Sequence, residues 1–379
     1  MSPEEVKGTV FCGSFSSEKT AKLILNSMHA LKAKFRTKSG EIWVYEDCAG
    51  LGTMLDAIRR TGLAVRGIGA SEEVVWLQTW LRRCGYGIVD SDLRKKTSLV
   101  QMTRGSLTIY AIGYLCQPYS MSGLKKGDSD PRVRGMMSKV IAFIDAHEPR
   151  VVFLEEVFGF DQTRAAKILK CALRRAGYTV SDFMFDSRAY VPQHRDRYYI
   201  VAVHTKWSDL TPDRLTEVLT PTPEDAPPML EDMPPHGMEF RPMCEFTSKS
   251  NSDGEATVIA RNAGYVQTCG FRHLSVADFG ASPTRQTVQE HISPCVTKAR
   301  AESRRLYLVT PGATQAARLT LIQLGFLQGW SQDDVTAMLE VADQKDCKVG
   351  AALGNGMTVP VVQAIIANLH KHCPKCFQT

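Results

Sequence analysis

The first half of the chain alternates short apolar runs with longer stretches in which apolar residues recur every three or four positions. Short apolar runs are typical of buried strands, and the three-to-four spacing indicates one apolar face of a helix. We therefore predict strands at 42–45, 64–68, 107–112, 151–154 and 198–203, and helices at 54–60, 73–81, 136–146 and 163–175. Strands that alternate with helices favour an α/β fold with a doubly wound, mostly parallel sheet, which binds ligands at the carboxyl ends of its strands.

The pattern changes at about residue 205. Residues 205–255 hold many prolines and acids, and residues 256–310 alternate short apolar runs with Gly, Ser and Thr. We predict a smaller, irregular, β-containing domain with long loops over both stretches. Helical spacing returns at 314–327 and again at 359–370.

These changes divide the chain into four parts. We expect an accessory N-terminal segment with one short helix, a large α/β domain, the smaller domain, and a C-terminal segment that returns to the large domain. Their predicted bounds are 1–40, 41–204, 205–310 and 311–379.

Composition narrows the class of protein. The 379 residues are 44% hydrophobic and 23% charged, which is ordinary for a globular protein. No run of about 18 apolar residues predicts a membrane span, and the first 30 residues lack the pattern of a secretory signal. We expect a protein that is not secreted, nuclear if eukaryotic and cytoplasmic if prokaryotic. A net charge of +6 permits a polyanionic partner without requiring one.

The eleven cysteines are scattered, and without a signal they are expected to be reduced thiols. The tail from His370 to Cys376 holds one Cys-x-x-C pair, whose spacing suits zinc but which has no second half. The alternative is an exposed tail, and we predict no metal site.

A thiol and a carboxylic acid each follow a predicted strand. Cys116 lies in Gly-Tyr-Leu-Cys-Gln-Pro-Tyr-Ser (113–120), and Glu155 lies in Phe-Leu-Glu-Glu-Val (153–157). Such a pair suits attack on an electron-poor ring whose nitrogen is protonated at the same time. Taken alone, Cys116 also fits a buried core cysteine, and Glu155 a helix-capping acid.

A glycine-containing turn follows the first predicted strand, in Glu-Asp-Cys-Ala-Gly-Leu-Gly (46–52). Glycines at a strand-to-helix turn let a ligand approach the backbone, and a carboxylate about 20 residues later, Glu72 or Glu73, suits ribose hydroxyls. Asp92 follows as a further acid. A simple tight turn and a helix-capping acid are the alternatives.

Further along, Gln193, Arg195 and Arg197 alternate before the last predicted strand. On a strand they share one face, and two guanidinium groups there suit a phosphate and a base carbonyl. A solvated edge strand is the alternative. Three more segments enter the comparison below: Ser-Pro-Cys-Val-Thr (293–297), Arg-Leu-Thr-Leu-Ile-Gln with Leu-Gln-Gly-Trp (318–330), and Gly-Asn-Gly-Met-Thr-Val (354–359).

In their order along the chain, these motifs resemble those of the cytosine-5 methyltransferases, over about 41–203 and 293–369. The resemblance implies a Rossmann-like methyltransferase fold, S-adenosylmethionine as cofactor and double-stranded DNA as partner. It implies a catalytic set of Cys116, Glu155, Arg195 and Arg197. It implies a cofactor-binding set of Glu46, Cys48, Ala49, Gly50, Gly52, Glu72, Asp92 and Asn355, and a substrate-binding set of Gln117, Ser120, Gln193 and Thr297.

The chain departs from the family pattern at several positions. Cys48 stands where the family usually has Phe, Thr53 where it has Gly, and Gln323 where it has Glu. Leu115 replaces the proline before the catalytic cysteine, and Glu156 replaces the Asn after the catalytic glutamate. In the family that Asn braces the Pro-Cys loop, so both changes fall on one contact.

Two alternatives to a DNA methyltransferase stay open from the sequence. The first is a tRNA cytosine-5 methyltransferase of the same fold, and the second is a nucleic-acid-binding scaffold without activity. For DNA, loops within 205–292 are expected to read the major groove, and a basic cluster to hold phosphates. That cluster comprises Lys125, Lys126, Arg132 and Arg134. A monomer is the simplest expectation.

Overall fold

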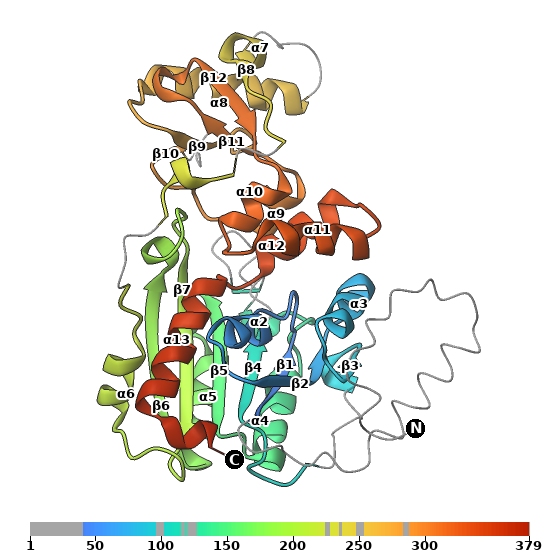
Figure 1. The fold of residues 1–379 in the computed structure, drawn as a ribbon, viewed down its shortest axis with the longest axis vertical. Coiled ribbons are helices and arrows are strands. Elements are labelled where there is room, and N and C mark those ends of the chain that lie inside the picture. Colours follow the sequence, from blue (N-terminus) through green and yellow to red (C-terminus); the bar gives the residue numbers. More distant parts are fainter. Residues whose placement is uncertain are drawn as a thin grey trace, which may run out of the picture.

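The computed structural model describes residues 41–95, 102–114, 118–119, 127–223, 228–234, 237–247, 254–282 and 288–378. The chain forms two lobes with a group of helices between them (Figure 1). The predicted helix within residues 1–40 lies outside the described residues. So do Leu115, Cys116, Gln117, Ser120, Lys125 and Lys126.

The large lobe is built on a seven-stranded sheet in the order β3-β2-β1-β4-β5-β7-β6. Its strands are β1 (Ile42–Asp47), β2 (Val65–Ser71), β3 (Ile88–Asp90), β4 (Ile109–Gly113), β5 (Val151–Val157), β6 (Tyr178–Asp186) and β7 (Asp196–His204). Neighbours from β3 to β5 are parallel, whereas β7 runs antiparallel to both β5 and β6. This confirms the predicted α/β fold with a mostly parallel sheet.

Helices cover both faces of this sheet because side chains of each strand alternate between two cores. Ile42 and Val44 face a core that includes residues of α2 (Thr53–Arg60), α6 (Pro212–Leu219) and α13 (Val359–His372). Trp43 and Tyr45 face a second core with residues of α4 (Met136–His147) and α5 (Arg164–Arg175). The helix α3 (Val75–Arg83) follows β2. The C-terminal helix α13 thus packs on the same sheet as the first strand of the chain.

The strand order reverses direction between β1 and β4. The chain runs outward from β1 through β2 to β3, and then crosses back to β4 on the other side of β1. In open α/β sheets a crevice forms at such a point, beyond the carboxyl ends of the strands. The ends of β1 and β4 are therefore where a ligand site is expected.

The small lobe has a second, antiparallel sheet in the order β10-β9-β11-β12-β8. Its strands are β8 (Arg241–Pro242), β9 (Ser275–Asp278), β10 (Val288–Glu290), β11 (Leu306–Val309) and β12 (Gln315–Arg318). Two helices, α7 (Met243–Thr247) and α8 (Gly254–Cys269), pack on it around Phe279. Between the lobes lie α9 (Lys298–Glu302), α10 (Leu321–Phe326), α11 (Gln332–Val341) and α12 (Asp346–Asn355) (Figure 1).

Two sequence-based predictions for the small lobe were wrong. Helical spacing predicted a helix over 314–327, but residues 315–318 form β12, because Ala316 and Ala317 pair with Val309 and Leu308 of β11. No helix was predicted within 256–310, yet α8 spans 16 residues. Its buried side chains are Asn262, Ala263 and Val266, and only the last two are apolar, so the apolar face is too narrow to produce a clear helical pattern.

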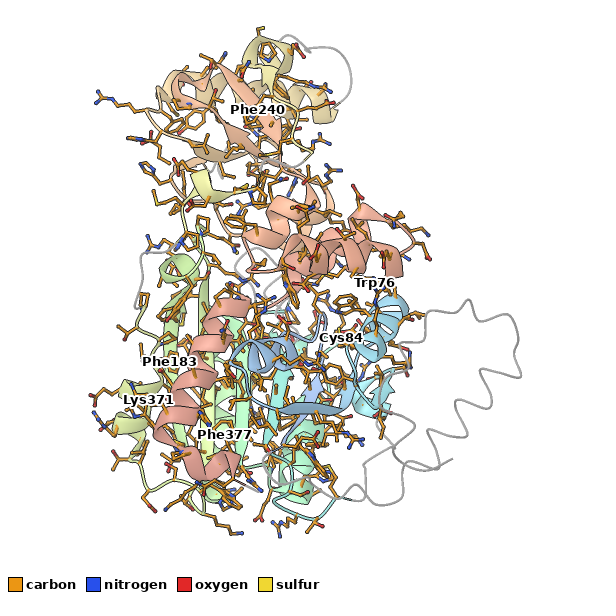
Figure 2. All side chains as sticks on the ribbon, viewed as in Figure 1. Trp76, Cys84, Phe183, Phe240, Lys371 and Phe377 are labelled. Carbon is orange, nitrogen blue, oxygen red and sulfur yellow. The ribbon has the colours of Figure 1, made fainter. Side chains whose placement is uncertain are left out.

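The C-terminal tail is packed, and the alternative of an exposed tail was therefore wrong. Cys373 and Cys376 are buried, and their sulfur atoms lie 3.6 Å from Ser208 Oγ and 3.9 Å from Trp207 O. Phe377 is 7% exposed and lies at the end of α13 in the large lobe (Figure 2). Both thiols serve as core side chains, and burial raises the pKa of each above its ordinary value.

One segment has the length and composition of a membrane span. It runs over Asp346–His372, with a mean hydropathy of 1.5, but 67% of its apolar window is buried within the protein. The segment is divided into α12 and α13, which pack between the lobes and on the large sheet. Core helices commonly pass such a test, so this segment is weak evidence for a span.

Candidate functional site

A cavity of about 340 Å³ lies at the carboxyl ends of the large sheet, and we call it the sheet-edge cavity. Its lining comes from the ends of β1, β2, β4, β5 and β7 and from the C-terminal end of α12. Nine of the predicted site residues line it, namely Cys48, Ala49, Gly50, Glu72, Asp92, Glu155, Arg195, Arg197 and Asn355. These residues span more than 300 positions of sequence and meet because parallel strands end at one edge.

The turn after β1 presents its backbone to the cavity. Cys48 has a φ of 51° and Gly50 a φ of 53°, so the chain turns sharply before α2. Gly52, with a φ of 72°, is the N-cap of α2 and lies outside the cavity lining. A Cβ at Gly52 would lie 3.0 Å from Leu81 and 3.1 Å from Tyr86, so this glycine serves close packing of the turn.

Glu72, at the end of β2, holds the same turn. Its Oε2 accepts a hydrogen bond of 2.9 Å from Gly50 N, and its Oε1 accepts one of 2.9 Å from Val74 N. Burial raises the pKa of Glu72, although these two bonds oppose the shift. The carboxyl group therefore couples the glycine turn to the start of α3 at the cavity wall.

Asp92 lies at the same end of the cavity, after β3. Its carboxylate accepts from Arg94 N at 2.8 Å and forms an ion pair of 3.0 Å with Arg94 Nε. Glu73 also lines this end, together with the apolar side chains of Val74 and Leu77. One end of the sheet-edge cavity is thus acidic, with an apolar wall beside it.

Glu46 lies behind the cavity and does not line it. The side chain is fully buried, and the Tyr86 hydroxyl donates a hydrogen bond to its Oε2. Burial raises the pKa of Glu46 to about 7, although the bond from Tyr86 lowers it. The adjacent Asp47 is also fully buried and accepts a bond of 2.7 Å from Ser71 Oγ, which joins β1 to β2.

At the opposite end of the cavity, Glu155 pairs with Arg197. Glu155 occupies the last part of β5 and is 7% exposed, and its Oε1 lies 3.0 Å from Arg197 Nε. Arg197 lies near the start of β7, which pairs antiparallel with β5, so the register of two neighbouring strands brings the two groups together. The ion pair fixes the carboxyl group at the cavity surface.

Glu156 points to the other face of β5, as strand alternation requires. It is 1% exposed, its Oε2 accepts a bond of 2.7 Å from Val157 N, and its Oε1 is buried without a hydrogen-bond partner among the described residues. Burial raises the pKa of Glu156 well above its usual range, and the charge on Glu155 adds to the shift. Burial therefore favours the uncharged form of the Glu156 carboxyl group.

Arg195 is 2% exposed and is held mainly by main-chain oxygens. Its Nη1 donates to Val296 O at 3.0 Å, and its Nη2 donates to Gly356 O at 2.6 Å. These contacts fix the guanidinium group at the point where the large lobe meets α12. The prediction that Gln193, Arg195 and Arg197 share one strand face was wrong, because β7 begins at Asp196.

Cys295 is a residue of the site region that the sequence did not single out. Its sulfur lies 3.6 Å from Arg195 Nη1 and 3.9 Å from Arg197 Nη2. Burial raises the pKa of the Cys295 thiol, whereas the positive charges of Arg195, Arg197 and Arg300 lower it. The charges have the larger combined effect, so the pKa of Cys295 lies below its ordinary value. The motif Ser-Pro-Cys-Val-Thr carried the only signal, and it pointed to Thr297.

Gln193 and Thr297 support the site from outside the cavity lining. Gln193 is fully buried, donates from Nε2 to Leu327 O and accepts from Val296 N, each at 2.6 Å. Thr297 is the N-cap of α9, and its side chain accepts from Arg300 N. Gln193 thus ties together three segments far apart in sequence.

Asn355 lies at the end of α12 and lines the cavity. The helix approaches α9 so closely that a Cβ on Gly354 would lie 2.5 Å from backbone atoms of Thr297 and Lys298. Gly354 is therefore required by packing, which explains the Gly-Asn-Gly order of this motif. Lys298, whose role the sequence did not suggest, also lines the cavity.

The loop that holds Cys116 is only partly described. Cys116, Gln117 and Ser120 lie outside the described residues, so their placement is not tested. Tyr114, two residues before Cys116 in the sequence, lines the cavity and packs against Phe160 at a ring distance of 5.8 Å. Arg132, one of the predicted phosphate-binding residues, also lines the cavity and pairs with Asp130 at 2.7 Å.

The sheet-edge cavity therefore has two chemically different ends. Glu72, Glu73 and Asp92 make one end acidic beside an exposed glycine turn. The other end holds two cations, Arg195 and Arg197, and the carboxyl group of Glu155, which is fixed by its ion pair with Arg197. The first suits a ligand with hydroxyls and a positive charge, and the second suits a polar ring or a phosphate.

Comparisons with known proteins agree with this geometry. The chain is 34% identical over 97 residues to the type II methyltransferase M.NlaX of Neisseria lactamica, covering 24% of this chain and 31% of that protein. It is 30% identical over 109 residues to a DNA-cytosine methyltransferase of Escherichia coli K12, covering 24% of this chain and 23% of that protein. The matched part spans about a third or less of these curated relatives.

Solved structures resemble most of the chain. The S. pombe Dnmt2 methyltransferase has a TM-score of 0.55 at 17% identity, covering 87% of this chain and 98% of that one. The Entamoeba histolytica methyltransferase EhMeth has a TM-score of 0.53 at 13% identity, with the same coverage. At these identities the likeness shows the fold alone.

The family assignment rests on the longest match. The model of the C-5 cytosine-specific DNA methylases matches residues 45–371, which include all nine predicted residues that line the sheet-edge cavity. The fold and the sequence relatives agree with that match. The chain belongs to the C-5 cytosine-specific DNA methylase family.

Proposed function

We propose that this chain transfers a methyl group from S-adenosylmethionine to carbon 5 of cytosine in DNA. The observation that carries the proposal is the pairing of Glu155 with Arg197 at the same cavity that the glycine turn and Glu72 line. An acid for the base and a turn for the cofactor thus lie at two ends of one site. Family membership supplies the reaction class.

The acidic end fits the cofactor. Gly50 exposes main-chain atoms beside Glu72 and Asp92, whose carboxylates suit ribose hydroxyls and an adenine amine, and Val74 and Leu77 offer apolar surface. Cys48 stands in place of the usual Phe, so these apolar side chains take over contact with the adenine. When bound, S-adenosylmethionine supplies an electrophilic methyl group.

The cationic end handles the cytosine. The Glu155 carboxylate, paired with Arg197, holds a proton taken up with the base at ring nitrogen 3, which makes carbon 6 electrophilic toward the Cys116 thiolate. Formation of the sulfur–carbon 6 bond leaves electron density on carbon 5, which takes the methyl group. Loss of the carbon 5 proton to water then breaks the sulfur–carbon 6 bond and restores the free thiolate, and the proton on ring nitrogen 3 returns to Glu155. Arg197 keeps Glu155 in position throughout.

The target base has to leave a duplex to reach this depth. Arg195 lines the cavity, and its contacts with Val296 O and Gly356 O join the large lobe to the segments at α9 and α12. A base bound beside Arg195 is therefore enclosed by the large lobe and by these two segments between the lobes. Such enclosure excludes water from the reacting atoms.

Transfer of a labelled methyl group to genomic DNA and, in parallel, to total tRNA tests the proposal. We expect label in DNA with the unmodified protein and none with Cys116→Ala. Label only in tRNA would move the function to the RNA substrate. Absence of label from both, with the protein folded and the cofactor bound, would contradict the proposal and favour a nucleic-acid-binding scaffold.

A further inference from the structure

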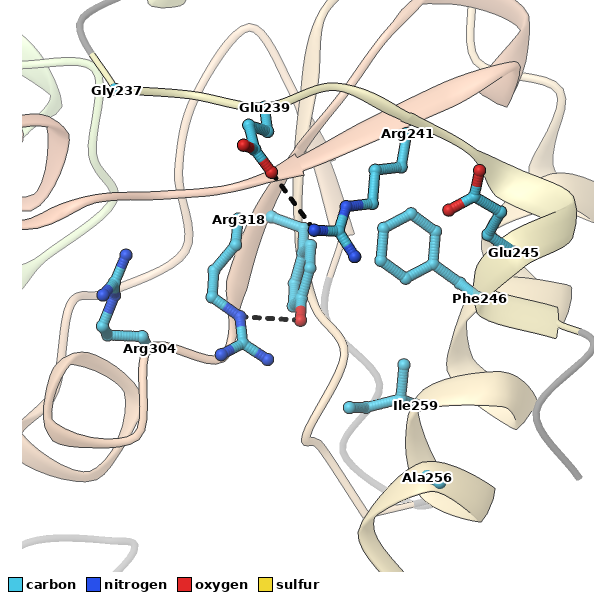
Figure 3. A pocket seen from close by; sticks show the side chains of 10 residues that line it. Gly237, Glu239, Arg241, Glu245, Phe246, Ala256, Ile259, Arg304 and Arg318 are labelled. Carbon is cyan, nitrogen blue, oxygen red and sulfur yellow. Dashed lines mark hydrogen bonds and ion pairs between the residues drawn. The ribbon is translucent and has the colours of Figure 1, made fainter. Parts of the chain in front are cut away.

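The small lobe contains a second cavity, of about 460 Å³, which we call the small-lobe cavity (Figure 3). It shares no lining residue with the sheet-edge cavity among the described residues. Its volume falls within the range of ordinary small-molecule sites, about 300–1,000 Å³. The described residues assigned to methyl transfer, Glu155, Arg195 and Arg197, line the sheet-edge cavity instead.

One wall of the small-lobe cavity is cationic. Arg241 belongs to β8, Arg304 precedes β11 and Arg318 ends β12, and all three side chains line the cavity. Figure 3 shows their guanidinium groups spread across the cavity, with Arg304 and Arg318 to the left and Arg241 beside Phe246. Two glutamates, Glu239 and Glu245, also line it, so three positive charges face two negative ones.

Among the three arginines, Arg318 has the most donors left to bind a ligand. Its Nε donates a hydrogen bond of 2.9 Å to the Tyr307 hydroxyl, and its guanidinium carbon lies 5.4 Å from the centre of that ring. Tyr307 is 4% exposed and stacks on Phe279 at 4.4 Å, so the support is rigid. Arg318 has no carboxylate partner among the described residues, which leaves both of its terminal nitrogens for an anion.

The other two arginines have partners but keep donors free. Arg241 pairs with Glu239 at 3.1 Å, and Arg304 pairs with Asp346 of α12 at 2.7 Å. In both pairs the arginine and the acid are partly or largely exposed, so a phosphate can compete for the guanidinium. Arg304 Nε is also buried without a hydrogen-bond partner among the described residues.

The opposite wall is apolar and includes a fixed aromatic ring. Phe246 of α7 packs edge-on against Phe279 at 5.7 Å and against Tyr307 at 5.5 Å. Ile259 and Ala256 of α8 continue this wall. In Figure 3 the Phe246 ring lies beside the Arg241 guanidinium, above Ile259. A flat ring placed here meets apolar surface on one side and guanidinium groups on the other.

We propose that the small-lobe cavity binds one unpaired nucleotide, with its base against Phe246 and Ile259 and its phosphate on Arg318. Nucleotides combine the flat ring and the anion that the two walls require, and stacking on aromatic side chains holds any base through its π face. This inference rests on the proposed function, because that function supplies a polynucleotide. It identifies the preferred substrate region as one with an unpaired nucleotide near the target cytosine.

Binding of a fluorescent five-nucleotide single strand to the full chain tests the proposal, with anisotropy as the readout. We expect Arg318→Gln and Phe246→Ala each to weaken binding at least fivefold, since stacking contributes about 1–3 kcal/mol per base. The matched control is Arg214→Gln, which removes an exposed arginine that pairs with Glu217 on α6, and its affinity should not change. A blunt duplex of the same sequence should bind without dependence on Arg318.

Adenosine 5′-monophosphate identifies the source of the ligand. Displacement of the single strand by this nucleotide, lost in Arg318→Gln, would assign the site to free nucleotides as well as polynucleotides. Binding of the single strand alone would restrict it to polynucleotides. Wild-type affinity in both folded variants, or equal dependence of the duplex on Arg318, overturns the proposal. Because no methyl transfer is measured, a failure here is distinct from a failure of the proposed function.

Discussion

The two cavities hold their charged groups in opposite ways. In the sheet-edge cavity, Arg195 is 2% exposed and fixed by main-chain oxygens, and Glu155 is fixed by Arg197. In the small-lobe cavity, Arg318 is exposed and anchored through one hydroxyl. The first arrangement is set before any ligand arrives, as chemistry requires, and the second adapts to what it binds. On the proposed function, the large lobe carries out the reaction and the small lobe contributes to recognition.

The largest effect should come from Glu155→Gln in the sheet-edge cavity. The amide keeps the shape of the acid but cannot deliver a proton to the base, and a general acid typically contributes about 10²–10⁴-fold in rate. We expect methyl transfer to fall at least about 100-fold, with binding of nucleic acid retained. Single-turnover transfer of labelled methyl measures this.

Glu156→Gln is the matched control, because Glu156 is the adjacent residue on β5 but lies outside the cavity lining, and burial favours its uncharged form. Its rate should stay within about threefold of the unmodified protein, well below the contribution of a general acid. Equal losses in both variants would contradict the assignment of the proton to Glu155.

The raised pKa of Glu46, on β1 of the large lobe, predicts that the stability of the protein depends on pH. Its pKa in the folded protein is raised to about 7 from an ordinary value of 4.5. Between these values the folded state keeps a proton that the unfolded state has lost, so the free energy of unfolding falls as pH rises. The loss approaches about 3 kcal/mol by pH 7, at 1.36 kcal/mol for each unit.

Urea unfolding of Glu46→Gln beside the unmodified protein isolates this contribution. The stability of the variant relative to the unmodified protein should increase from pH 4.5 to pH 7 and then level off. A difference that stays constant over that interval would show that Glu46 is ionised in the folded state.

The large lobe was predictable from sequence because its elements have strong local patterns. Strand 42–45 and helix 136–146 bury continuous or regularly spaced apolar side chains, and both appear within a few residues of their predicted bounds. In the small lobe, Ala316 and Ala317 pair with β11 through backbone hydrogen bonds, and such pairing leaves no pattern of apolar and polar residues in the sequence. Tertiary pairing there overrides local spacing.

The candidate site shows the same division. Gly50 and Glu155 line the cavity and belong to short sequence motifs. They could be identified from the sequence because these motifs occur in the same order as in the family. Gln193 was assigned to substrate, but its side chain joins Leu327 and Val296 within the protein. Cys295 was missed, because a single thiol has no signature until the fold brings Arg195 and Arg197 to it.

Gln193→Ala tests the joint between the two lobes. It leaves Leu327 O and Val296 N buried without partners, which costs about 1–3 kcal/mol. We expect that loss in urea unfolding, together with a higher KM for nucleic acid. Gln332→Ala, at an exposed position at the start of α11, serves as control and should change neither value. A Gln193→Ala protein as stable as the control would show that contacts other than those of Gln193 hold these segments together.

The smallest effect should come from the small lobe. Asn262 on α8 is 2% exposed and donates to Phe279 O at 2.8 Å and to Ala281 O at 2.9 Å. Asn262→Ala should loosen this lobe by about 1–2 kcal/mol. If recognition and reaction are separate, KM for nucleic acid rises a few fold while kcat and cofactor affinity stay unchanged. A fall in kcat would break that separation.

We propose above that the sheet-edge cavity carries out covalent methyl transfer to cytosine. Incubation with S-adenosylmethionine and an oligonucleotide that contains 5-fluorocytosine tests it directly, because fluorine at carbon 5 prevents release of the enzyme. Intact-mass spectrometry should find a stable adduct of protein, oligonucleotide and one methyl group, absent from Cys116→Ala and strongly reduced in Glu155→Gln. Tight binding of the oligonucleotide without any adduct would contradict the account and leave a nucleic-acid-binding scaffold.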